Sequence, residues 1–136
     1  MKKTLPLQKY RILIVDQHPF TAQLIARMLV RRGFRVAIAA DGPDALDWLA
    51  EEKFDAVLSE MFLPGNSGLD LLRRIHRLFP RLPVALMSAF LADELHQSAL
   101  AEGAVEFFKK PVSSQALVEL FARARQTRPM AELVAA

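Results

Sequence analysis

Apolar and polar positions along the chain follow two alternating patterns. Short apolar runs, typical of buried strands, alternate with stretches in which apolar residues recur every three or four positions, as in an amphipathic helix. The runs that predict strands are 11–15, 36–40, 54–59, 83–87 and 105–108. The stretches that predict helices are 19–33, 45–49, 67–79, 92–102 and 114–126. The pattern therefore predicts five consecutive strand–helix units.

Several predicted helices also carry recognisable start or stop signals. Pro19 suits the first helical position, and Gly33 follows the end of the same apolar stripe. Ser67 is a candidate N-cap, with Asp70 three residues later as its reciprocal partner in a capping box. These signals support the boundaries that the hydrophobic pattern indicates.

The predicted strands are apolar along their whole length rather than on alternate residues. Such strands are buried on both faces, which indicates a parallel sheet covered by helices on each side. We therefore expect one doubly wound α/β domain over residues 10–126, with an N-terminal tail at 1–9. Residues 127–136 are interpreted as a C-terminal tail or the start of a linker.

Composition narrows the class of protein. The chain has 136 residues, 52% of them hydrophobic and 24% charged, which fits one globular domain. It has no cysteine, which excludes disulfides, thiolate zinc sites and cysteine catalysis. No apolar run approaches the roughly 20 residues of a membrane helix, so we expect a cytoplasmic protein without membrane contact.

The net charge of +3 raises the question of nucleic-acid binding. Many of the arginines lie towards the C-terminal ends of predicted helices, where cations complement the helix dipole. They are Arg31, Arg32, Arg73, Arg74, Arg77, Arg123, Arg125 and Arg128. This placement favours solvated helix ends, and we expect no direct contact with nucleic acid.

Polar side chains follow four of the predicted strands. Ligands of doubly wound sheets bind beyond the carboxyl ends of the strands, so these side chains are expected to share one pocket. They are Asp16 and Gln17, Ser59 and Glu60, Ser88, and Lys109 and Lys110. Two carboxylates, a hydroxyl and an ammonium would meet there, either as a functional site or as a structural salt-bridge network.

These motifs, in this order, resemble the response-regulator receiver domain of two-component signalling. The matching segments are Ile12–Asp16, Asp41–Gly42, Leu63–Leu69, Pro83–Val84, Ser88–Ala89, Gly103–Ala104 and Phe107–Pro111. The resemblance implies a flavodoxin-like (βα)5 three-layer sandwich with strand order 2-1-3-4-5. It also implies a bacterial-type phosphorelay module that is not itself an enzyme.

The resemblance also assigns expected roles to single residues. Asp16, Ser88 and Lys110 match residues that the family uses. Gln17 stands where the family has a second acid that binds Mg²⁺, and Glu60 stands where it has the phosphorylated aspartate. Two positions therefore depart from the family pattern.

Further roles that the resemblance implies concern metal binding and switching. Any Mg²⁺ would be held by Asp16, Glu60 and the backbone carbonyl of Phe62, and the loss of an acid at Gln17 weakens that expectation, so no cofactor is expected. Phe107 occupies the aromatic position that couples to the Ser/Thr, although core packing alone would also explain it. His18 follows Asp16-Gln17, but a lone histidine does not make a metal site.

The two departures both oppose phosphorylation. Glutamate moves the nucleophilic oxygen outward by roughly 1.5 Å relative to aspartate, and a misplacement of about 1 Å can slow such a reaction about 100-fold. We therefore expect an atypical receiver that is not phosphorylated and acts through protein contacts in a fixed state, with Glu60 paired to Lys110. One alternative is a residually phosphorylated, Mg²⁺-dependent receiver. Another is a sensor that holds a small anion with Lys110 and Ser88.

The remaining expectations concern simpler roles and partners. Asp16 could cap the first helix or accept from loop amides, and Ser88 could satisfy a backbone group. The partner is expected to be a signalling protein or an output domain, and a homodimer is a further option. The contact surface would be the fourth helix, fifth strand and fifth helix. Its candidate apolar anchors, several of which must belong to the core, are Phe90, Leu91, Leu95, Phe107, Leu117 and Phe121.

Overall fold

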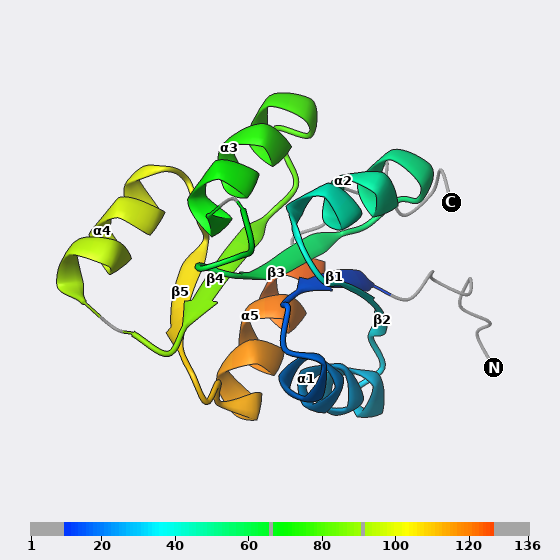
Figure 1. Ribbon diagram of the computed structural model, residues 1–136. Helices are drawn as coiled ribbons and strands as arrows, with labels where there is room; N and C mark the ends of the chain where they lie inside the picture. Colours follow the sequence, from blue (N-terminus) through cyan, green and yellow to red (C-terminus); the bar gives the residue numbers. More distant parts are fainter. Residues whose placement is uncertain (1–9, 66, 91, 127–136) are drawn as a thin grey trace, which may run out of the picture.

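The computed structural model describes residues 10–65, 67–90 and 92–126, and its centre is a parallel sheet (Figure 1). The strands are β1 (Arg11–Val15), β2 (Arg35–Ala39), β3 (Ala56–Glu60), β4 (Val84–Ser88) and β5 (Glu106–Lys109). All neighbouring strands are parallel and their order is β2-β1-β3-β4-β5. The doubly wound α/β fold with this strand order is confirmed.

Helices cover both faces of the sheet. They are α1 (Pro19–Arg31), α2 (Gly42–Glu51), α3 (Gly68–Leu78), α4 (Asp93–Ala101) and α5 (Ser114–Gln126). Figure 1 shows α2, α3 and α4 on one side of the sheet and α1 and α5 on the other. The result is a three-layer sandwich.

The uninterrupted apolar character of the strands follows from this layering. Leu13 and Val15 of β1 belong to the core beneath α2, α3 and α4, whereas Ile12 and Ile14 belong to the core beneath α1 and α5. All four side chains have no exposed surface. Both faces of the central strands are therefore buried.

The predicted helix signals are confirmed. Pro19 is the first residue of α1, and Gly33, two residues after α1, has a φ of 92°, a left-handed conformation that glycine adopts readily. The Ser67 side chain accepts a hydrogen bond from the Asp70 N–H, and the Asp70 carboxylate accepts one from the Ser67 N–H. The capping box at the start of α3 thus forms as the sequence predicts.

The end of β3 lies one residue beyond its predicted position. The sequence pattern ends this strand at Ser59, but Glu60 pairs with Met87 of β4, and the Met61 N–H donates to the Met87 carbonyl. The pattern missed this because a charged residue does not extend an apolar run. Glu60 is therefore fixed by the sheet itself and does not lie in the loop that follows it.

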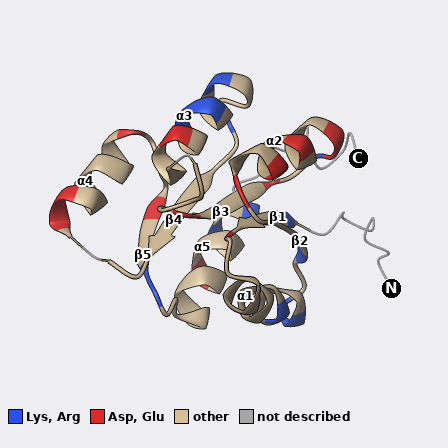
Figure 2. Ribbon diagram, in the orientation of Figure 1, with Lys and Arg blue, Asp and Glu red and all other residues tan. Residues whose placement is uncertain are grey.

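The basic residues lie at separate places on the surface, as Figure 2 shows for the ends of α1 and α3. Arg31, Arg77 and Arg125 lie in the last turns of their helices, as predicted. Arg73 differs, because it lies inside α3 and pairs with Asp70 at 3.2 Å and with Glu102 at 2.9 Å. Arg128 lies outside the described residues. No helix of the described part of the chain is long and apolar enough to span a membrane.

Candidate functional site

Three charged side chains converge at the carboxyl end of the sheet. Asp16 follows β1, Glu60 ends β3, and Lys110 follows β5. The Lys110 Nζ lies 2.7 Å from Asp16 Oδ2 and 2.5 Å from Glu60 Oε1. The ammonium thus bridges both carboxylates, which confirms the predicted Glu60–Lys110 pair and adds Asp16 to it.

The remaining carboxylate oxygens accept backbone hydrogen bonds. The His18 N–H donates to Asp16 Oδ1 at 2.9 Å, and the Phe62 N–H donates to Glu60 Oε2 at 3.1 Å. Asp16 is only 2% exposed and Glu60 6% exposed. Each of the four carboxylate oxygens therefore has a donor, as buried charged groups require.

The loop after Glu60 is held by close backbone contacts. The Gly68 N–H donates to the Met61 carbonyl, and Phe62 forms an isolated antiparallel bridge with Ser67. A Cβ on residue 68 would lie 2.5 Å from the Glu60 carbonyl oxygen, so only glycine lets α3 start this close to the end of β3. This contact helps to hold the Glu60 backbone in place.

Lys110 is charged in a partly buried position. Burial by itself lowers the pKa of Lys110, but the hydrogen bonds to Asp16 and Glu60 and the charges of these carboxylates together raise this pKa above its ordinary value. Lys110 therefore stays protonated over the physiological pH range. The bridge between the two carboxylates is accordingly a permanent feature of the site.

The raised pKa of Lys110 predicts a loss of stability at high pH. The folded state holds this proton more tightly than the unfolded chain, whose lysine pKa is about 10.4. The contribution of Lys110 to the free energy of unfolding is therefore complete below about pH 10.4 and is lost as pH rises through the higher folded value. Urea unfolding between pH 8 and 11, chosen to span about that value, should show a steeper alkaline decline for the native chain than for Lys110→Met. Equal slopes would contradict the prediction.

Ser88 serves a local turn and stands apart from the charged bridge. It is completely buried, and its Oγ accepts a hydrogen bond from the Phe90 N–H at 3.0 Å. In the described part of the chain, no side-chain hydrogen bond joins Ser88 to Glu60 or Lys110. The simpler expectation for Ser88, satisfaction of a backbone group, matches this geometry. Lys110 and Ser88 are both already engaged, so the anion-sensor alternative gains no support from them.

The other predicted positions lie outside the charged bridge. The Gln17 side chain is exposed and takes no part in the bridge. Phe107 is 4% exposed and lies in the core, with its ring 5.8 Å from the ring of His96. His18 is exposed and contributes only its backbone N–H to the site. The described residues contain no group of three or more His, Cys, Asp or Glu that could hold a metal ion.

An aromatic pair between the loops that follow β3 and β4 was not predicted. The rings of Phe62 and Phe90 meet edge to face, with centroids 6.1 Å apart and planes at 89°. Phe62 is 48% exposed and Phe90 70% exposed. The sequence shows a bulky residue at 62, but the contact depends on how the loops after β3 and β4 approach each other.

Most of the predicted apolar anchors are part of the core. Phe107, Leu117 and Phe121 are buried, so they are the members of this set that belong to the core, as was expected of several of them. Leu95 is partly buried and packs against the core, whereas Phe90 is exposed. Leu91 lies outside the described residues. The sequence does not show which members of the set are buried, because that depends on which side of α5 and β5 packs against neighbouring elements.

Comparison with known proteins identifies the family of this chain. The family model described as the response regulator receiver domain matches residues 12–122. The response regulator protein PilR of Pseudomonas aeruginosa is 37% identical over 93% of this chain, which spans 28% of that protein. The sensor histidine kinase RcsC of Salmonella typhi is 37% identical over 86% of this chain and 13% of its own length. The chain thus spans less than a third of each of these relatives.

Solved structures show the same fold. The signal receiver domain of an HD domain-containing protein from Pseudomonas fluorescens Pf-5 has a TM-score of 0.82 and 28% identity, covering 88% of this chain and 96% of that one. A response regulator from Thermotoga maritima has a TM-score of 0.81 and 29% identity, covering 88% of this chain and 100% of that one. The chain therefore belongs to the response regulator receiver domain family of two-component signalling.

Proposed function

We propose that this receiver domain is not phosphorylated and acts through protein–protein contacts in one fixed arrangement. The observation that carries the proposal is the bridge of Lys110 between Glu60 at 2.5 Å and Asp16 at 2.7 Å. In this reading, Glu60 supplies a permanent negative charge at the position where the family's phosphoryl acceptor stands.

The geometry of Glu60 opposes attack on a phosphoryl donor. One carboxylate oxygen accepts from Lys110 and the other from the Phe62 N–H, so neither is left unpaired. Phosphoryl transfer depends almost wholly on positioning and charge neutralisation. The Glu60 carboxylate is displaced by one carbon–carbon bond and both of its oxygens already accept hydrogen bonds, so it is poorly positioned for attack.

The donor set also fits Mg²⁺ poorly. Mg²⁺ demands near-ideal octahedral oxygen coordination and relies on carboxylates together with substrate phosphates. Here the two carboxylates are already neutralised in part by the Lys110 ammonium, and Gln17 adds no charge. We propose weak Mg²⁺ binding, with no role for the ion in the function of the domain.

The aromatic pair supports a role in protein contact. Phe62, two residues after Glu60, and Phe90, two residues after Ser88, form a ring pair with exposed apolar surface next to the ends of β3 and β4. Exposed apolar surface of this kind is typical of interaction sites, and aromatic residues are enriched in interfaces. A partner that binds beside the loops after β3 and β4 would meet these rings, while the buried bridge holds the loop of Phe62 through the Phe62 N–H.

The setting of this activity is a signalling pathway in the cytoplasm. The relatives named as a response regulator and a sensor histidine kinase are several times longer than this chain. We propose that the partner is a signalling protein or an output domain. Homodimerisation through α4, β5 and α5 is a further proposal, weakened by the burial of Phe107, Leu117 and Phe121.

An intact-mass measurement tests the proposal. The protein is incubated with Mg²⁺ and a small acyl phosphate, and we expect no added phosphoryl group. A phosphoryl adduct that disappears in Glu60→Ala would overturn the proposal and make this a working receiver with glutamate as acceptor. An adduct that persists in Glu60→Ala would overturn it as well, by placing the acceptor elsewhere. A related receiver with aspartate at this position serves as the positive control.

A further inference from the structure

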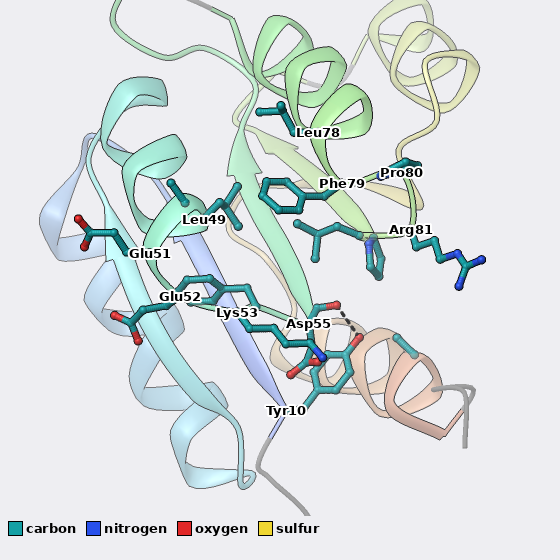
Figure 3. Close-up of a pocket in the computed structure, with 15 residues that line it drawn as sticks. Tyr10, Leu49, Glu51, Glu52, Lys53, Asp55, Leu78, Phe79, Pro80 and Arg81 are labelled. Carbon is teal, nitrogen blue, oxygen red and sulfur yellow. Dashed lines mark hydrogen bonds between the residues drawn. The ribbon is translucent and has the colours of Figure 1, made fainter. Parts of the chain in front are cut away.

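A groove lies at the end of the molecule opposite the charged bridge (Figure 3). It has a volume of about 840 Å³ and is lined by residues that precede β1, β3 and β4 and by the C-terminal ends of α2 and α3. Its volume is within the range of ligand-binding pockets, roughly 300–1,000 Å³. Nothing in the proposed signalling function uses this groove.

The groove is apolar at its centre. Leu49 and Phe54 are buried there, whereas Leu78 is 62% exposed and Phe79 36% exposed. Figure 3 shows Leu49, Leu78 and Phe79 directed towards the same space from α2 and from the end of α3. Exposed apolar side chains grouped around a groove indicate that another apolar surface covers them.

The two edges of the groove carry opposite charges. Glu51 and Glu52 lie on the α2 side, and Arg81 lies on the side that follows α3. Glu52 already pairs with Arg11 at 2.7 Å, whereas Glu51 and Arg81 are both exposed. The exposed charges at the edges can stay in water, so an occupant of the groove needs above all an apolar stripe that covers its centre.

The chain itself contains a segment of this kind. Residues 127–136 carry Met130, Leu133 and Val134 at positions i, i+3 and i+4, spacing that places them on one face of a helix, with Arg128 and Glu132 nearby. Ala124 of α5 lines the groove, so this segment follows directly from its border. Helix α5 ends at Gln126, and Met130 follows four positions later, a stretch that spans up to about 14 Å when the chain is extended.

We propose that segment 127–136 docks in this groove through Met130, Leu133 and Val134. The apolar face covers Leu78 and Phe79. This docking takes place at the end of the sheet remote from Glu60. Its test therefore does not depend on whether the domain is phosphorylated.

Cross-linking tests this docking in the full chain. The protein has no cysteine, so the pair Lys53→Cys and Ala131→Cys introduces the only thiols. Lys53 lines the groove and is exposed, and Ala131 lies outside the proposed apolar face. With a short bis-maleimide, we expect rapid formation of an intramolecular cross-link, measured by intact mass.

The deciding comparison adds Leu133→Asp and Val134→Asp to the cysteine pair. Removal of two apolar anchors should slow the intramolecular cross-link at least about tenfold, the equivalent of about 1.4 kcal/mol in docking. A matched control, Leu5→Asp with Leu7→Asp in the same cysteine background, is expected to leave the rate unchanged.

Three outcomes would overturn the proposal. An unchanged rate with Leu133→Asp and Val134→Asp would mean that tethering alone brings the thiols together. If the control substitutions slow the cross-link equally, residues 1–9 rather than 127–136 occupy the groove. Covalent dimers in place of the intramolecular product would assign it to a second copy of the chain.

Discussion

Replacement of Gln17 and Glu60 together by aspartate is expected to convert the domain into a phosphorylated receiver. Glu60→Asp withdraws the carboxylate by roughly 1.5 Å, and an error of about 1 Å can change the rate about 100-fold. Gln17→Asp adds a second carboxylate for Mg²⁺ beside Asp16. With an acyl phosphate donor, the double variant should gain one phosphoryl group in an intact-mass spectrum, whereas the native chain should gain none.

The single variants separate the two effects. Each of Gln17→Asp and Glu60→Asp alone corrects one deficiency, so each should be phosphorylated far more slowly than the double variant. Circular dichroism should confirm that all variants keep the fold. If a folded double variant gains no mass, these two positions do not decide whether the domain is phosphorylated. The Phe62–Phe90 pair, in the loops after β3 and β4, would then be the next feature to remove.

Substitution of Lys110 by methionine is expected to destabilise the fold more than any other single change at this site. It leaves Asp16, 2% exposed, and Glu60, 6% exposed, as neighbouring buried anions without a cation. Breaking a buried ion pair by removal of one partner costs about 3–5 kcal/mol. For a domain of this size, the melting temperature should fall on the order of 10 °C. Thermal and urea unfolding measure both quantities.

Two further variants show whether the charge is the cause. Lys109 is exposed and lies next to Lys110 in the chain, so Lys109→Met should change the stability by less than about 0.5 kcal/mol. Adding Glu60→Gln to Lys110→Met removes one of the two unpaired anions and should recover part of the lost stability. If the double variant is less stable than Lys110→Met alone, the role assigned to Lys110 is contradicted.

Much of the fold could be predicted from the sequence because its determinants are local. Apolar runs such as 11–15 indicate strands buried on both faces, and the Ser67–Asp70 capping box marks the start of α3. Parallel strands place their carboxyl ends at one edge, so the convergence of Asp16, Glu60 and Lys110 also follows from the order of the elements. The glutamate at residue 60 can be read directly from the chain.

The remaining features of the site depend on tertiary contacts. The sequence does not reveal that Lys110 reaches Asp16 as well as Glu60, because that bridge joins residues 94 positions apart. It does not show that Ser88 accepts from Phe90 rather than joining the bridge, or that Phe62 and Phe90 meet. Apolar residues such as Phe107 and Phe90 look equivalent in the chain, but one is buried and the other exposed.

The sequence by itself determined the elements, their order, and which charged groups stand at the ends of the strands. The tertiary structure decided which of those groups pair, which apolar side chains remain exposed, and where a groove forms between α2 and α3. The physical reason is the range of the interactions. Propensity, capping and hydrophobic periodicity act over a few residues, whereas ion pairs and ring contacts require distances that only the assembled layers define.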